Sequence, residues 1–224
     1  MDTIADTDLD GSLTSAIDHH GGNATSASFF SKDQPRRLSL DMFGTSHGGG
    51  RAIYLAGFDV FRDDAVSHGK WLVSLCRDAG FEGLYPLDVS PPSGLSGVQL
   101  AAWIYRANVE LIRRADFVIA NVNDFRSVGE PDSGTAFEIG FATALGKTVW
   151  GYSSSVDPLI ARVPSSGTDG ANRCQRGFIV EDFGLPVNLM IGCSVKIVHG
   201  GPEECLAAIL AHEDGMSEHG VCRA

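Results

Sequence analysis

The 224-residue chain is long enough for one α/β domain with a full-sized core and extensions at its ends. Its net charge of −11 excludes nucleic acid as an expected partner, because binding to phosphates requires clustered Lys and Arg, whereas a single neutral nucleoside is compatible. The acidic N-terminus lacks an apolar signal segment and no apolar run is long enough to span a bilayer, which predicts a cytoplasmic protein without membrane contacts.

Residues 1–50 mix small polar residues with few large apolar ones, which predicts a disordered extension with at most a turn of helix near residues 38–43. Gly44 to Gly48 match the G-x-S-x-G pattern of a nucleophile elbow, and residues 47–50 resemble the oxyanion loop of lipases. An elbow requires a strand before the serine and a helix after it, and neither pattern is present. We therefore interpret the segment as a Gly-rich leader.

Residues 51–56 form the first apolar strand pattern, which ends at Gly57, on the edge where ligands of parallel sheets bind. The G-x-G-x-x-G fingerprint is absent, so a dinucleotide cofactor is not expected. Residues 63–78 have helical spacing, and Gly80 ends this helix. Three apolar residues are predicted on its inward side: Trp71, Leu72 and Leu75.

Residues 81–87 predict the second strand, and the Pro/Ser/Gly-rich loop at 88–97 is placed to fold over a substrate. The longest predicted helix covers residues 97–114, with a buried stripe made by Leu100, Ile104, Leu111 and Ile112. Asn108 lies on the same stripe, and a buried amide without partners costs about 1–3 kcal/mol. It is therefore either bonded to the backbone or directed into a polar site.

The centre of the chain predicts a right-handed βαβ unit. Residues 116–122 are a buried strand, residues 134–145 a helix with Phe137, Phe141 and Ala144 on one side, and residues 148–152 the next strand. The connecting loop at 123–134 must lie beyond the carboxyl ends of the strands, where ligands bind. It carries three carboxylates, and we expect the chemistry here: Asp124, Glu130 and Asp132.

The C-terminal third contains weaker signals. Residues 153–173 predict a surface loop, residues 177–181 a short strand, and residues 195–198 the last strand. Pro202, followed by two glutamates, predicts the start of a final helix that ends near His212, with residues 213–224 as a frayed tail.

Two interpretations of Glu138 are open. Thr135 to Glu138 match a capping box, in which the glutamate bonds back to the first amide of the helix, with Asp132 or Ser133 as the N-cap. Alternatively, Glu138 is a catalytic carboxylate on the ligand-facing edge. The helix dipole partly offsets the rise in pKa that burial causes, so we expect this carboxylate to be ionised at neutral pH. Such a group suits nucleophilic attack on an anomeric carbon.

No metal or other cofactor is expected. The chain has five cysteines without a CxxC pair, which favours free thiols over a disulfide framework or a zinc site. They are Cys76, Cys174, Cys193, Cys205 and Cys222.

Four segments, in order and at consistent spacing, carry a family resemblance: IYLAG at 53–57, ADFVIAN at 115–121, EPDSGTAFEIG at 130–140 and GLPVNLM at 184–190. With them the chain resembles the nucleoside 2'-deoxyribosyltransferases over most of residues 51–210. The resemblance implies a flavodoxin-like, doubly wound and mostly parallel sheet with helices on both faces, in a catalytic domain at residues 51–212. It also implies transfer of the deoxyribosyl group of a 2'-deoxynucleoside to another nucleobase.

The resemblance also implies roles for individual residues. Glu138 matches the nucleophile that forms a covalent deoxyribosyl-enzyme, and Tyr54 matches the tyrosine that orients it. Asp132 matches the carboxylate that holds the 5'-hydroxyl of the sugar. Asn188 matches an amide donated to the same hydroxyl across a dimer interface, which implies a homodimer or larger homo-oligomer with shared active sites.

Further substrate contacts are expected within or beside the matching segments, at Gly57 and Met190. Asn108 stands where some family members have an aspartate that protonates or orients the base, and an amide cannot be a general acid. Asp88 is the substitute candidate for the proton donor. The first motif has Phe58 where proline is frequent.

Three functions are therefore weighed, with small molecules as the only expected partners besides copies of the chain. The first is the transferase. The second is a hydrolase that sends the same intermediate to water, acting on a nucleoside or its 5'-monophosphate. The third is a non-catalytic domain that senses nucleosides.

Overall fold

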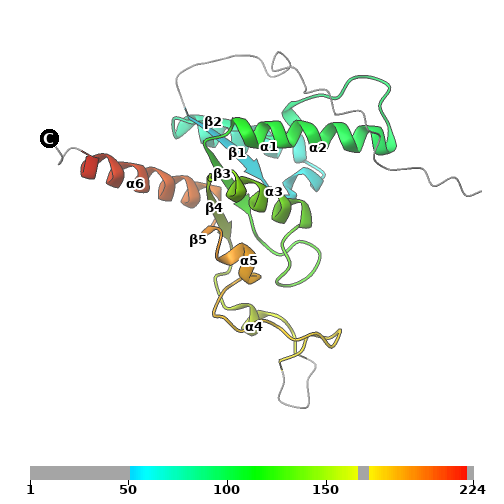
Figure 1. Ribbon diagram of the computed structural model, residues 1–224, viewed down its shortest axis with the longest axis vertical. Helices are drawn as coiled ribbons and strands as arrows, with labels where there is room; N and C mark the ends of the chain where they lie inside the picture. The colour runs from blue at the N-terminus through cyan, green and yellow to red at the C-terminus, as the bar shows by residue number, and fades with distance from the viewer. Residues whose placement is uncertain (1–50, 166–171, 221–224) are drawn as a thin grey trace, which may run out of the picture. The chain divides into compact units, whose positions relative to one another are not determined.

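The computed structural model describes residues 51–165 and 172–220 (Figure 1). Five strands form one sheet in the order β2-β1-β3-β4-β5, and every neighbouring pair is parallel. The order reverses between β1 and β3, which is the switch point where flavodoxin-like sheets bind ligands. The predicted fold class is confirmed. The strands are β1 (Ala52–Ala56), β2 (Glu82–Leu84), β3 (Phe117–Asn121), β4 (Thr148–Ser153) and β5 (Lys196–His199).

Helices cover both faces of the sheet (Figure 1). Helices α1 (Ala65–Asp78) and α6 (Pro202–Gly220) pack on one face through residues such as Leu72 and Ile209. Helices α2 (Gly97–Arg114) and α3 (Ser133–Ala144) pack on the other through Ile112 and Ile139. Four short helical segments complete the chain: η2 (Phe58–Phe61), η3 (Pro86–Asp88), α4 (Leu159–Arg162) and α5 (Leu189–Gly192).

Alternation along β1 decides which side chains face which helices. All five of its residues are buried, as expected for a strand covered on both faces. Ile53 and Leu55 join the core under α1 and α6, whereas Tyr54 and Ala56 join the core under α2 and α3. The hydroxyl of Tyr54 is therefore directed to the layer that contains Glu138.

A chain of hydrogen bonds ties together the loops that follow β1, β3 and β4. Asn121 donates from Nδ2 to the buried carboxylate of Asp59 at 3.0 Å, and His68 contacts the same carboxylate at 3.2 Å. Asn123 donates to Oδ1 of Asn121 at 2.8 Å and accepts from the hydroxyl of Ser154 at 2.7 Å. These bonds fix the carboxyl edge of the sheet, where the candidate site lies.

The long helix was predicted with its observed bounds, 97–114, but one residue predicted as buried on it, Ile104, and one on α1, Trp71, were wrong. Trp71 is 40% exposed and Ile104 is 43% exposed. The buried stripe of α1 instead contains Ala65, Gly69, Leu72 and Cys76, and that of α2 contains Trp103, Ala107, Leu111 and Ile112. Adjacent helical residues are about 100° apart, so choosing the neighbouring large residue shifts the stripe off the core.

Three further expectations are corrected. The second strand ends at Leu84, because Pro86 has no amide to donate and starts η3. Residues 177–181 form no strand; Ile179 makes an isolated bridge with Arg173. The final helix continues past His212 to Gly220, since a glycine inside a helix costs only about 1 kcal/mol.

The helix at 133–144 also buries a different side from the one its aromatic residues mark. Its buried residues are Thr135, Ile139 and Ala142, whereas Phe137 is 48% exposed and stacks on Phe141.

The predicted leader, its elbow motif and the turn near residues 38–43 lie outside the described residues. Within the described ranges, no helix combines the length and apolar composition that crossing a membrane requires.

Two glycine-to-alanine changes should shift stability in opposite directions. A Cβ at Gly69 in α1 would lie 2.2 Å from Cε1 of the buried Tyr85 ring, so Gly69→Ala should lower the free energy of unfolding by about 1–3 kcal/mol. A Cβ at Gly140 in α3 would meet nothing within 4 Å, so Gly140→Ala should raise it by about 0.5–1 kcal/mol. Urea unfolding of both variants measures the two signs, and equal changes would contradict the packing described for Tyr85.

Candidate active site

A hydrogen bond between sheet and helix defines the candidate site. Tyr54 on β1 donates from its hydroxyl to Oε1 of Glu138 on α3 at 2.5 Å. Tyr54 is fully buried, and both burial and the neighbouring Glu138 carboxylate raise its pKa well above its usual value. The phenol therefore stays protonated and serves as a donor to the carboxylate.

The surroundings of Glu138 raise its pKa to about 7. Burial is the main cause, the nearby Asp132 carboxylate adds to the rise, and the hydrogen bond from Tyr54 opposes it. Burial therefore outweighs the favourable helix end, and the pKa of Glu138 lies closer to neutral pH than the sequence predicted.

The capping-box interpretation of Glu138 was wrong, whereas the expectation that Asp132 or Ser133 is the N-cap was confirmed for Asp132. The carboxylate bonds to Tyr54, and Asp132 is the N-cap of α3, accepting from the amide of Thr135 at 3.0 Å through Oδ2. The hydroxyl of Thr135 donates to the same oxygen at 3.3 Å. Within the part of the chain that the structure describes, Oδ1 of Asp132 has no hydrogen-bond partner, so this oxygen can accept from a ligand.

Glu138 and Asp132 line a cavity of about 500 Å³ between α2, α3 and the loops after β1 and β2. This volume falls within the range of about 300–1,000 Å³ that is usual for small-molecule sites. Two other predicted residues, Gly57 and Asn108, line the same cavity. Most of the remaining lining is apolar and includes Val60, Phe61, Pro86, Leu87, Leu100, Trp103, Ile104 and Ala107. None of these residues was predicted in the site from the sequence, and Leu100 and Ile104 were assigned to the core.

Asn108 brings an unsatisfied polar atom to this cavity. Its Oδ1 is buried and has no hydrogen-bond partner. Of the two predicted alternatives, bonding to the backbone is not what the structure contains, and the amide lines the site. A buried carbonyl oxygen without a donor costs about 1–3 kcal/mol, and a ligand N–H would remove that cost.

In the loop after β1, the glycine is required by close packing and the aromatic residues contact a second loop. A Cβ on Gly57 would lie 2.7 Å from Oδ2 of Asp59 and 2.9 Å from Cβ of Asn121, so only glycine fits here. Phe58 and Phe61 both stack on Phe125, with ring centroids 5.2 and 5.4 Å apart. This aromatic cluster joins the loop after β1 to the loop after β3.

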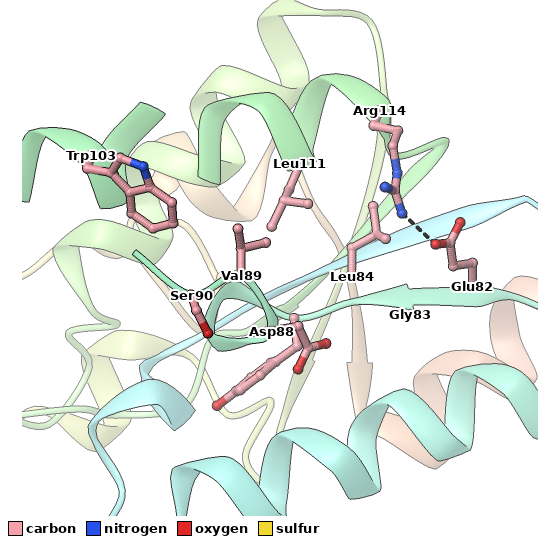
Figure 2. A pocket seen from close by; sticks show the side chains of 10 residues that line it. Glu82, Gly83, Leu84, Asp88, Val89, Ser90, Trp103, Leu111 and Arg114 are labelled. Atoms are coloured by element: carbon pink, nitrogen blue, oxygen red, sulfur yellow. Dashed lines mark hydrogen bonds and ion pairs between the residues drawn. The ribbon is translucent and has the colours of Figure 1, made fainter. Parts of the chain in front are cut away.

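Asp88 lies in a separate cavity of about 360 Å³ (Figure 2). The two cavities share Val89, Ser90 and Trp103, and the far end of the second is closed by the 2.5 Å ion pair between Arg114 and Glu82. Partial burial raises the pKa of Asp88. The structure therefore does not place Asp88 among the residues that line the Glu138 cavity.

Asn188 and Met190 are also apart from Glu138 within the chain. They line a third cavity of about 740 Å³ on the other side of α3, together with Ala136, Ile139 and Gly140. Asn188 is exposed and caps the short helix α5, and Met190 is 73% exposed.

The other carboxylates of the central loop hold the loop itself. Asp124 accepts from the amide of Gly129 at 2.8 Å and pairs with Arg162, while Glu130 accepts from the hydroxyl of Ser127 at 2.7 Å. Among the described residues, no cluster of three or more His, Cys, Asp or Glu side chains is arranged to hold a metal ion.

Comparisons with known proteins point to one family. The family model described as nucleoside 2-deoxyribosyltransferase matches residues 53–190, which is more than half of the chain. A solved 2-desoxiribosyltransferase from Leishmania mexicana is 33% identical, with a TM-score of 0.59, over 72% of this chain and 98% of that chain. An uncharacterized protein of Schizosaccharomyces pombe is 33% identical over 104 residues, which are 46% of this chain and 49% of that protein. The match thus spans about half the length of this curated relative.

Removing the Tyr54 hydroxyl should raise the pKa of Glu138 above 7. The hydrogen bond stabilises the ionised carboxylate, and a bond to a charged group is worth about 1.5–3 kcal/mol, or ~1–2 pKa units. We expect this shift in Tyr54→Phe, measured by ¹³C NMR titration of the Glu138 carboxyl, and therefore a smaller ionised fraction at pH 7. Tyr105→Phe, which removes a hydroxyl from an exposed ring, is the matched control. An unchanged titration in Tyr54→Phe would show that the bond does not act on Glu138.

Proposed function

This chain belongs to the nucleoside 2-deoxyribosyltransferase family, and from that premise we propose that it transfers the 2-deoxyribosyl group of a 2'-deoxynucleoside between nucleobases. One observation carries the proposal: the carboxylate of Glu138 accepts a hydrogen bond from Tyr54 in a largely apolar cavity of small-molecule size. This arrangement combines a positioned nucleophile with a surrounding that excludes water.

In the proposed reaction, a carboxylate oxygen of Glu138 attacks C1' of the sugar while the bond between C1' and the base nitrogen breaks. The base leaves with the bonding electron pair and takes up a proton. A nitrogen of the second base then attacks C1', the bond between C1' and the Glu138 oxygen breaks, and the second base gives up its N–H proton, which balances the proton taken up by the first base. Two displacements retain the configuration at C1', and the negative charge of Glu138 stabilises the oxocarbenium-like transition states.

Other residues of the cavity have proposed roles in binding. Oδ1 of Asp132 accepts a hydrogen bond from the 5'-hydroxyl of the sugar. Asp132 lines the same cavity as Glu138, and its Oδ1 has no other partner among the described residues. Asn108 on α2 bonds the edge of the base, and Trp103 and Ala107 on the same helix supply apolar contact. Asn108 cannot donate a proton as an acid, so the leaving base takes its proton from another source.

We also propose that the site is shared between copies of the chain in a homodimer or larger homo-oligomer. Asn188 and Met190 match the segment that the family donates to a neighbouring site, and both side chains are exposed outside their own Glu138 cavity. Residues 51–212 are the proposed catalytic domain.

A hydrolase is the alternative, with water in place of the second base. Its 5'-monophosphate version is disfavoured, because the lining of the Glu138 cavity contains no Lys, Arg or His within the described residues, and the Asp132 charge repels a phosphate. A non-catalytic sensor is the second alternative. It gives no reason for the bond between Tyr54 and Glu138.

A product assay separates these functions. The protein is incubated with 2'-deoxyinosine or thymidine, with and without free adenine, and the products are separated by chromatography. Formation of 2'-deoxyadenosine is the expected result. Free base without a new nucleoside would indicate hydrolysis, and unchanged substrate with measurable binding would indicate the sensor.

Removing the proposed nucleophile should abolish most turnover. Glu138→Ala should lower kcat by ~10³-fold or more, because it removes the carboxylate that forms the proposed covalent intermediate. Glu203→Ala, which removes an exposed carboxylate at the start of α6, is the control and should retain full activity. A rate that is merely halved in Glu138→Ala would contradict the proposed role.

Asn108 should matter for activity but not for stability. In Asn108→Ala, kcat/KM for a 2'-deoxynucleoside should fall by about tenfold, the value of one hydrogen bond to the base. Since Oδ1 is buried without a partner among the described residues, its removal relieves a cost of about 1–3 kcal/mol, and the free energy of unfolding should stay the same or rise. Kinetics and urea unfolding measure the two quantities, and a stability loss that matches the activity loss would assign Asn108 to the core instead.

A further inference from the structure

Asn188 is held by a residue that the sequence did not single out. Its Nδ2 donates to Oε1 of Glu181 at 2.5 Å, and the amide of Leu189 donates to Oε2 of the same carboxylate at 2.8 Å. The Oδ1 of Asn188 accepts from the amide of Met190 at 3.0 Å, as an N-cap does. Glu181 thus accepts hydrogen bonds from both the side chain of Asn188 and the backbone amide that follows it.

The bonds to Glu181 and Met190 together fix the orientation of the Asn188 side-chain amide. The N-cap bond alone leaves the Nδ2 side of Asn188 without a fixed partner. A carboxylate on that side accepts only, so it forces nitrogen rather than oxygen toward Glu181 and prevents the amide from turning over. One N–H of Nδ2 is used by Glu181, and the second N–H remains available on an exposed side chain.

The local chain is built to bring these two residues together. Gly184 has a φ of +70°, a conformation that favours glycine, and it turns the backbone between Glu181 and Asn188. Below the turn, the backbone is anchored to α4: the amide of Leu159 donates to the carbonyl of Leu185 at 2.7 Å. Arg162 donates to the carbonyl of Pro186 at 3.0 Å and also pairs with Asp124 of the central loop.

We propose that Glu181 is a positioning residue, which orients the Asn188 amide so that it donates to the 5'-hydroxyl of a 2'-deoxynucleoside bound in the site of a second copy of the chain. This inference rests on the proposed function, in which Asn188 is contributed across a homo-oligomer. In this role, Glu181 affects the bond to the 5'-hydroxyl only through Asn188. A glutamate that merely stabilised α5 through the Leu189 amide would affect all ligands alike.

The test compares ligands with and without the 5'-hydroxyl in a protein that does not turn them over. Full-length protein carrying Glu138→Ala is titrated by calorimetry with thymidine and 5'-deoxythymidine, and with 2'-deoxyinosine and 2',5'-dideoxyinosine. With Glu181 present, the hydroxyl should improve Kd by about tenfold, the value of one well-oriented hydrogen bond. Adding Glu181→Ala should remove most of this ratio and leave the Kd of the 5'-deoxy ligands unchanged.

Two further variants separate positioning from stability. Glu181→Gln keeps the size but has one acceptor oxygen in place of two, so the ratio should be restored in part. In Asn188→Ala the share of the ratio that Asn188 supplies is already lost, the share from Asp132 remains, and adding Glu181→Ala should cause no further change. Asp182→Ala is the matched control, because this neighbouring exposed carboxylate has no hydrogen-bond partner among the described residues, and the ratio should stay at its full value.

Several results would overturn the inference. One is that Glu181→Ala weakens the binding of ligands with and without the 5'-hydroxyl equally. Another is that the losses of Glu181→Ala and Asn188→Ala add in the double variant. A third is that, while Glu181 is present, binding is absent or does not depend on the 5'-hydroxyl. Failure of the transferase is a separate result, because binding is measured without turnover. A protein that binds but catalyses no exchange would contradict the proposed function and still decide the role of Glu181.

Discussion

The hydrogen bond between Tyr54 and Glu138 is the interaction on which the candidate site depends. A buried phenol needs an acceptor and a buried carboxylate needs donors, and each group satisfies the other. The bond also joins β1 to α3, two elements 84 residues apart in sequence, so it exists only when the sheet and helix are correctly packed. Strand alternation provides one half, since Tyr54 faces the α3 layer. The Asp132 cap provides the other half by fixing where α3 begins.

Buried hydrogen bonds, as well as the packing of aromatic rings, fix the loops around this bond. Asp59 is 5% exposed, and its bonds to Asn121 and His68 link the loop after β1 to β3 and α1. The chain of polar side chains continues through Asn123 to Ser154 after β4. Because each amide both donates and accepts in this chain, the carboxyl edge presents a fixed surface to the cavity. Only glycine fits at position 57, because a Cβ there would lie too close to Asp59 and Asn121.

Much of this arrangement could be predicted from the sequence, for identifiable reasons. The strands β1, β3 and β4 are mostly apolar runs, the helix at 97–114 has apolar residues at helical spacing, and Glu138 lies just behind a loop at the ligand edge. Helix phase was less predictable, because Ile104 is large and apolar but lines the cavity instead of the core. The protonation of Glu138 depends on burial by residues distant in sequence. Glu181 carries no local signal, since its partner is created by a turn at Gly184.

The distribution of polar groups in the cavity determines which end of a nucleoside each helix suits. The two carboxylates, Glu138 and Asp132, both come from the first turns of α3, whereas α2 contributes Asn108 and apolar side chains such as Trp103. Hydroxyl groups of a sugar are matched by the acceptors of α3. A planar base, with apolar faces and a polar edge, is matched by α2 and needs few charges. In the proposed reaction, the C1' atom that joins sugar and base therefore lies between the two helices, beside the carboxylate of Glu138 that accepts from Tyr54.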